Sequence, residues 1–155
     1  MTDKDNKLYL EDFKEGEEMI SMGRTITETD VVMFAGITGD WNPLHTDKEF
    51  AGATPFGERI AHGALGFIVH SGLFSRIDRI QRSATIVIMG FKEWRYTRPI
   101  FIGDTVRLRL KVTGIRESTK KKDRGVLTLK RELINQKDEV VQEGISDTLV
   151  LRRPA

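Results

Sequence analysis

Residues 62–80 read HGALGFIVHSGLFSRIDRI and form the most apolar stretch of the chain. The length favours a helix over a strand, because strands usually span no more than about eight residues. Its first three turns are apolar around most of their circumference, as in a buried helix. Glycines at positions 63, 66 and 72 each weaken a helix by roughly 1 kcal/mol. They suggest a closely packed neighbour or a need for accessible backbone N–H groups at the helix start. We therefore predict a buried helix over residues 62–80.

The second half of the chain has the pattern of β-strands. Residues 105–112 read TVRLRLKV, in which apolar and polar residues alternate, as expected of a half-buried strand. Strands joined by short turns are antiparallel neighbours. We therefore predict one α+β domain over residues 1–155, in which an antiparallel sheet covers the helix. The other expected strands span residues 86–96, 126–134 and 145–151, with hairpin turns at residues 120–125 and 135–138.

The first half is predicted to be mainly helical. Thr27 and Asp30 have the spacing of a helix start, with a hydroxyl residue followed three positions later by a carboxylate. The helix is expected to end near residues 36–39. Pro43 stiffens the following segment. The remaining expected elements are a loop over residues 40–45, a short helix over residues 47–53 and a second loop over residues 54–57.

The composition sets limits on location and partners. With 25 basic and 23 acidic residues, the net charge is only +2. The cluster KKKDRG at residues 120–125 is therefore interpreted as a solvated turn, with a phosphate or nucleic-acid contact as the alternative. No apolar run approaches the roughly 20 residues that span a bilayer, and the polar residues 1–7 are unlike a secretory signal. The absence of cysteine excludes disulfides. We expect a cytoplasmic protein without nucleic-acid or membrane partners.

Asp40 and His45 are the strongest candidates for chemistry. They lie five positions apart on a proline-stiffened segment, so they can point at a common place. A histidine can take up or release a proton near neutral pH, and an aspartate can orient it or share a water molecule with it. The alternative is structural, with Asp40 capping a helix and His45 a satisfied polar residue. The other histidines are His62 and His70, and neither belongs to a metal-binding motif. No metal site is expected.

Three motifs together resemble a known family. Residues 39–45 read GDWNPLH, and the MaoC-like, (R)-specific enoyl-CoA hydratase (hydratase 2) family has the signature G-D-x-N-P-[LIV]-H. Residues 60–63, IAHG, followed by SG at residues 71–72, are similar to its second block. Residues 98–104, RPIFIGD, are similar to its P-[VI]-x-x-G-D turn. The resemblance extends over about residues 10–150, and three motifs in order are more specific than any one of them.

The resemblance implies a fold and roles for particular residues. It implies a hot-dog fold, in which a long helix is wrapped by an antiparallel sheet. Asp40 and His45 would activate the water that adds to an enoyl thioester, and the Gly63 N–H would stabilise the negative charge on the thioester oxygen. Ser71 would support Asp40, or be a small residue that permits close packing. Asn42 would shape the loop or contact the substrate or another subunit.

The remaining expectations concern the substrate and the assembly. Trp41, Phe67 and Phe74 are candidates for contacts with the acyl group. The bulk of Trp41, Phe67 and Ile68 disfavours a long straight chain. His62 is expected to cap the helix or to bond locally, and His70 to be a packing or interface residue. The resemblance implies an acyl-CoA or acyl carrier protein substrate, no cofactor beyond coenzyme A, and a homodimer or larger assembly. Two alternatives are an acyl-CoA thioesterase and a non-catalytic module that binds acyl thioesters.

Overall fold

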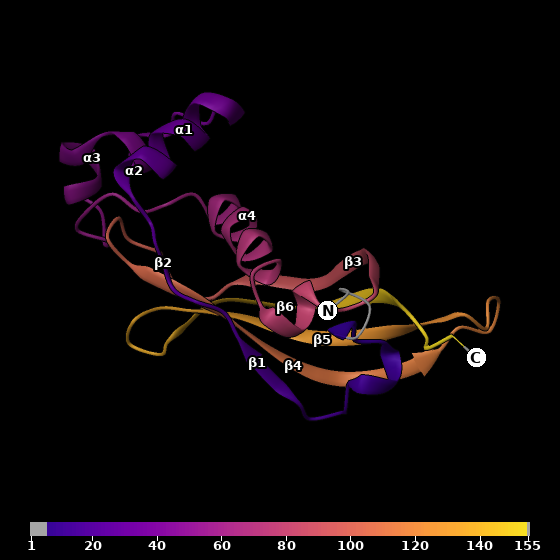
Figure 1. The fold of residues 1–155 in the computed structure, drawn as a ribbon. Helices are drawn as coiled ribbons and strands as arrows, with labels where there is room; N and C mark the ends of the chain where they lie inside the picture. Colours follow the sequence, from indigo (N-terminus) through magenta and orange to yellow (C-terminus); the bar gives the residue numbers. More distant parts are fainter. Residues whose placement is uncertain (1–5, 155) are drawn as a thin grey trace.

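The computed structural model describes residues 6–154, which form an antiparallel sheet crossed by one long helix (Figure 1). Five strands lie in the order β1-β4-β5-β6-β3, and β2 pairs with β4. Residues 1–5, which include most of the polar start of the chain, lie outside the described residues. The strands are β1 Glu18–Ile20, β2 Arg24–Thr25, β3 Thr85–Tyr96, β4 Thr105–Glu117, β5 Arg124–Ile134 and β6 Val140–Leu151.

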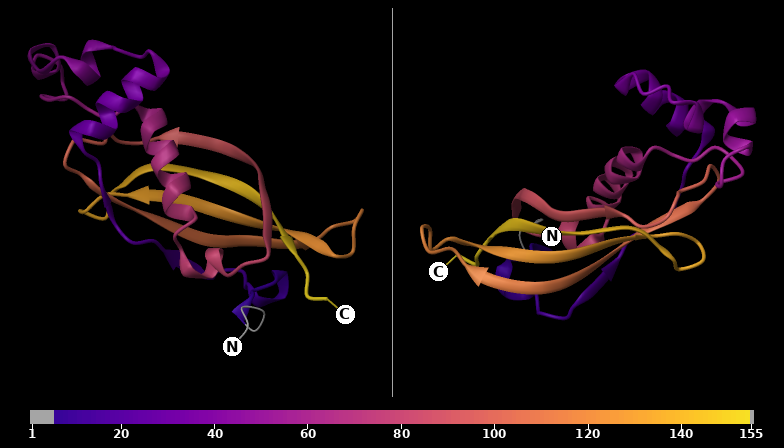
Figure 2. Two further views of the ribbon diagram at one scale, coloured as in Figure 1. Left: turned by 45° about the horizontal axis from the view of Figure 1, so that its top comes forward. Right: turned by 180° about the vertical axis from the view of Figure 1, so that it is seen from behind.

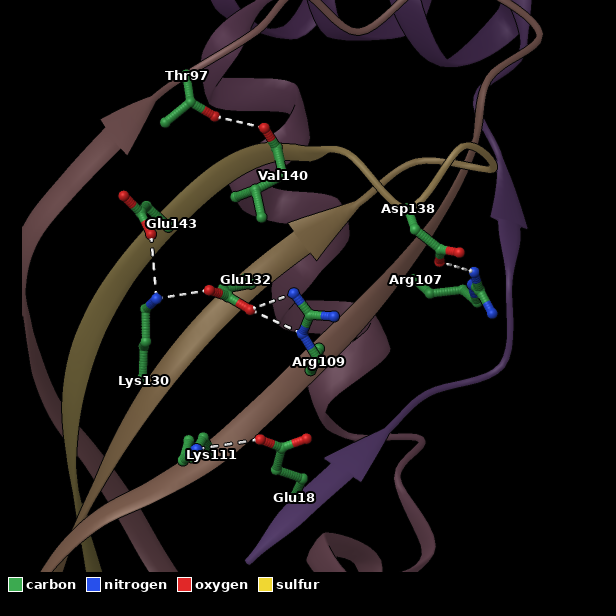
Figure 3. A network of polar contacts seen from close by, with 10 residues as sticks. All are labelled: Glu18, Thr97, Arg107, Arg109, Lys111, Lys130, Glu132, Asp138, Val140 and Glu143. Carbon is green, nitrogen blue, oxygen red and sulfur yellow. Dashed lines mark hydrogen bonds and ion pairs between the residues drawn. The ribbon is translucent and has the colours of Figure 1, made fainter. Parts of the chain in front are cut away.

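The strands confirm the predicted pattern and extend it. Alternate residues of β4, such as Leu108 and Leu110, are buried, whereas Arg109 and Lys111 lie on the opposite face and form ion pairs with neighbouring strands (Figure 3). The predicted turns at residues 120–125 and 135–138 both connect consecutive antiparallel strands, although residues 124 and 125 already belong to β5. Strand β6 begins five residues earlier than predicted, because polar residues on its inward face interrupt the apolar pattern.

Helix α4, Gly63–Phe74, lies across one face of the sheet (Figure 2). It is shorter than predicted, because the chain breaks at Ser75 and forms a separate turn, α5, at Asp78–Gln81. At the break the Ser75 hydroxyl donates to Gly72 O, and Ile77 adopts an extended conformation. The change of direction keeps Ile77 and Ile80 in the core, where they are 4% and 7% exposed.

Three helices gather at one end of the sheet, beyond the start of α4 (Figure 1). Helix α1, Glu28–Thr38, begins with the predicted capping box of Thr27 and Asp30 and ends at Gly39. Gly39 has φ of 75°, a left-handed conformation that glycine adopts without strain. The other helices are α2 Pro43–Thr46 and α3 Lys48–Gly52, and the 3-10 turn η2 spans Leu10–Asp12.

The predicted loop over residues 40–45 is wrong in part, because its second half is helix α2. Asn42 accepts a hydrogen bond from Leu44 N, and Pro43 occupies the first helical position, where its missing N–H costs nothing. Asp47 caps α3 in the same way. Between residues 6 and 154, no helix is long and apolar enough to cross a membrane.

Candidate active site

The segment from Asp40 to Thr46 is held in shape by its own hydrogen bonds. Asp40 N donates to Thr38 Oγ1 at 3.2 Å, and Asn42 N donates to Asp40 Oδ1 at 3.3 Å. The Thr46 hydroxyl lies 3.2 Å from the carbonyl oxygens of both Trp41 and Asn42. Asn42 and Asp47 cap the helices of this region. The Asp40 side chain is exposed and caps neither α2 nor α3, so its carboxylate can meet a ligand.

One nitrogen of the His45 imidazole is engaged by the backbone. Its Nδ1 lies 2.8 Å from Ile60 O. A carbonyl oxygen only accepts hydrogen bonds, so Nδ1 carries a hydrogen. His45 is half-buried. Nε2 is therefore the ring nitrogen that is left to contact a ligand.

His62 packs directly against His45. The two ring centroids are 3.8 Å apart with 31° between the planes, and Phe34 covers His62 at 4.8 Å. His62 is only 3% exposed, and its Nε2 donates to the backbone oxygen of Asp40 at 2.9 Å. His62 occupies the N-cap position of α4, as predicted, but its side chain makes no cap hydrogen bond and bonds instead to a residue 22 positions away.

Asp40, His45 and His62 each place one ligating atom within 4.8 Å of the others. Such a group is chemically able to hold a metal ion. His45 Nδ1 and His62 Nε2 donate to carbonyl oxygens, which leaves His45 Nε2 and His62 Nδ1 as the ring atoms that could ligate an ion. The two rings are tilted by 31°. The absence of a metal site stays a prediction.

The start of α4 supplies backbone donors beside this group. Among residues 6–154, the N–H groups of Gly63 and Ala64 have no hydrogen-bond acceptor, as is usual for the first residues of a helix. Gln142 Nε2 donates to Gly63 O at 2.9 Å. A Cβ atom at Gly63 would lie 3.1–3.2 Å from the ring of Tyr96. Glycine therefore permits Tyr96 and the helix start to approach closely.

A cavity of about 350 Å³ opens between the helix start and the end of β3. His45 and Gly63 both contribute to its wall, so a possible base and a possible oxyanion donor face the same space. Sequence analysis missed Tyr96 and Gln142, because Gln142 lies in the part of β6 that was not predicted. The remaining lining residues are Phe56, Ile60, Ala61, Thr97, Arg98, Pro99 and Ile100.

The other predicted site residues lie elsewhere. The Ser71 hydroxyl donates to Phe67 O at 3.2 Å, and eight helical residues place it about 12 Å along the axis from Gly63. One chain therefore does not bring Ser71 to Asp40. Trp41 is 56% exposed. Neither Phe67 nor Phe74 lines the cavity, so their predicted contact with the acyl group has no support from it.

Phe74 belongs instead to a buried cluster around Arg131, and the half-buried Phe67 adjoins this cluster through His70, with ring centroids 5.0 Å apart. The Arg131 guanidinium lies 4.0 Å from the Phe74 ring centroid, donates through Nε to Ser146 at 2.6 Å and contacts His70 Nε2 at 3.1 Å. Burial lowers the pKa of Arg131 to about 9. Burial also lowers the pKa of His70 to about 4; a bond to Phe67 O opposes this shift and the charge of Arg131 adds to it. At neutral pH, a charged arginine thus meets a neutral histidine.

Solved structures share this fold. The MaoC-like dehydratase from Rhodospirillum rubrum superposes with a TM-score of 0.83 at 27% identity, covering 96% of this chain and 99% of that one. A Mycobacterium tuberculosis protein described as a double hot-dog fold has a TM-score of 0.78 at 20% identity, covering 96% of this chain and 46% of that one. The predicted α+β, hot-dog fold is confirmed.

The fold and the site define a hot-dog protein with a carboxylate and two imidazoles beside a helix start. A family model described as "MaoC like domain" matches residues 13–132, and the chain belongs to the MaoC-like dehydratase family. It is 36% identical over 107 residues to the (R)-specific enoyl-CoA hydratase of Rhodospirillum rubrum, covering 69% of this chain and 71% of that one. It is 37% identical over 108 residues to the 3-hydroxybutyryl-CoA dehydratase of Methylorubrum extorquens, covering 70% and 66%. The predicted family and the hydratase or dehydratase class of enzyme are confirmed.

Proposed function

We propose that the protein catalyses the reversible hydration of trans-2-enoyl thioesters to (R)-3-hydroxyacyl thioesters. One observation carries the proposal: Asp40 and His45 place polar atoms within 4.8 Å of each other, and His45 lines a cavity whose wall also contains Gly63, although Asp40 does not line it. The names of two relatives, an (R)-specific enoyl-CoA hydratase and a 3-hydroxybutyryl-CoA dehydratase, support the substrate class and the stereochemistry.

The proposed reaction begins with a water molecule held between Asp40 and His45. The His45 Nε2 lone pair accepts a proton as the water oxygen forms a bond to C3. The C2–C3 π electrons move toward the thioester, and the Gly63 N–H stabilises the negative charge on its oxygen. The pair then returns the proton to C2, which restores its initial protonation. Dehydration follows the same steps in reverse.

The proposed reaction moves one water molecule and needs no cofactor besides the carrier of the acyl group. That carrier is coenzyme A or an acyl carrier protein. Arg98 is the only cationic side chain among the residues that line the cavity. It is 58% exposed and lies 3.6 Å from Glu139, so it is placed to meet a phosphate of the carrier at the entrance.

We further propose that the protein acts as a homodimer or larger homo-oligomer. Support comes from β3, a long edge strand of the sheet. Its apolar side chains Ile86, Val87 and Met89 are 43%, 50% and 56% exposed. An edge strand with exposed apolar residues favours pairing with another chain. A cytoplasmic location stays a prediction.

The reaction is tested with purified protein and crotonyl-CoA, by following loss of the conjugated enoyl thioester absorbance. We expect hydration by the wild type. Asp40→Asn and His45→Gln are each expected to lower kcat by about a thousandfold, because each removes one partner of the proton transfer. Both variants should unfold at a urea concentration close to that of the wild type, since neither side chain belongs to the core.

Asp47→Asn is the matched control. It makes the same chemical change seven residues from Asp40, at a position where an asparagine can also cap α3. The control should retain wild-type turnover. Near wild-type turnover by Asp40→Asn or His45→Gln would refute the role given to that residue. Release of free thiol without hydration would instead indicate a thioesterase.

A further inference from the structure

His62 connects three parts of the candidate site. Its backbone directly precedes Gly63 at the start of α4. Its Nε2 donates to Asp40 O at 2.9 Å, and its ring stacks on His45 at 3.8 Å. The acid, the base and the oxyanion donor therefore all adjoin one buried side chain.

The hydrogen bonding and the position of His62 indicate a structural role. Because Asp40 O only accepts, Nε2 carries the hydrogen. The Nδ1 atom is buried and has no hydrogen-bond partner among residues 6–154. His62 also does not line the cavity. An aromatic residue such as phenylalanine would fill the same space against His45 and Phe34 without burying an unpaired nitrogen.

An unpaired buried nitrogen is unfavourable and calls for an explanation. Stacking alone does not provide one, because a phenyl ring stacks as well. The bond from Nε2 to Asp40 O does, since only a donor at that ring position can make it. This bond spans 22 residues and joins the end of α1 to the start of α4.

We infer that His62 is a positioning residue for the proposed hydration. By holding the Asp40 backbone and the His45 ring against the start of α4, it fixes the distances among carboxylate, imidazole and Gly63 N–H. The inference rests on the proposed function. Small displacements of groups that must act together are costly, because the reacting atoms then miss their productive geometry.

The test compares two variants of His62 in the full chain with crotonyl-CoA. His62→Phe keeps an aromatic ring but removes the donor, and we expect kcat to fall on the order of a hundredfold. KM should change little, because His62 does not line the cavity. His62→Gln places an amide donor near the position of Nε2. It should therefore recover most of the lost kcat.

Phe34→Leu is the packing control. It trims a ring that packs against His62 but leaves the bond to Asp40 in place. It should lower the urea midpoint of unfolding while kcat stays close to that of the wild type. Equal losses of kcat in Phe34→Leu and His62→Phe, or no recovery by His62→Gln, would overturn the inference. Absence of wild-type activity would instead overturn the proposed function.

Discussion

His70 is neutral in the folded protein because it is buried beside a cation. Its pKa is lowered from 6.5 to about 4, so between these pH values the unfolded chain binds more protons than the folded chain. The free energy of unfolding should therefore fall as the pH drops from 6.5 toward 4, with His70 contributing up to about one proton to the slope. His70→Gln removes this proton but keeps an acceptor for Arg131. Urea unfolding at pH values from 7 to 4 should show a shallower fall for the variant than for the wild type.

The control for this measurement is His45→Gln, which removes a half-buried histidine outside the core. The free energy of unfolding of this variant should still fall steeply as the pH drops from 6.5 toward 4. If His70→Gln and the wild type lose stability in parallel over this range, His70 is not the group that titrates. Arg131 does not contribute to this pH dependence, because its pKa of about 9 keeps it charged between pH 7 and pH 4.

Single residues differ in how visible their roles are in the sequence. Asp40 and His45 could be named because both lie in one short segment, and the fold places them as that spacing suggested. The partner of His62 could not be named, because it lies 22 positions away and depends on how α1 meets α4. Gln142 was equally hidden, since a polar residue on the inward face of a strand looks like the end of that strand.

At the scale of elements, helix α4 contains two glycines whose surroundings differ, one crowded and one open. Gly66 faces the sheet, where a Cβ would collide with Gln142 and lie 2.8 Å from Ile100 Cδ1. Gly72 has no atom within 4 Å of such a Cβ. We expect Gly66→Ala to destabilise the protein by about 1–3 kcal/mol through overpacking. Gly72→Ala should stabilise it by up to about 1 kcal/mol through helix propensity. Urea denaturation of both variants measures the difference, and equal effects would contradict this description of the helix.

The elements themselves were largely predictable, and their ends were not. The capping box at Thr27 and the alternation in β4 are local signals, so α1 and β4 were found. The end of α4 depends on burying Ile77 and Ile80 against the sheet. No residue next to Ser75 in the sequence indicates that Ile77 and Ile80 will be buried. The same holds for α2, which is only one turn long and depends on the cap by Asn42.

At the scale of the whole molecule, β3 makes a prediction about assembly. If β3 pairs with a second copy, the protein should sediment at a mass of at least twice the 17.7 kDa of one chain. Met89→Lys places a charge on the exposed apolar edge and should shift the population toward the monomer. Met22→Lys, at a residue that is 72% exposed and outside the strands, should not. A monomeric wild type, or equal behaviour of both variants, would contradict assembly through β3.

The outer face of the sheet has a practical consequence. Lys111 pairs with Glu18 and Lys130 with Glu143 across neighbouring strands (Figure 3), and exposed pairs of this kind contribute little to stability. Helix α4 lies across one face of the sheet (Figure 2), and no lysine lines the cavity. Amine-reactive coupling to a solid support through these lysines would therefore leave the entrance open to solution. The outer face of the sheet can thus serve for immobilisation, while the cavity stays available to substrate.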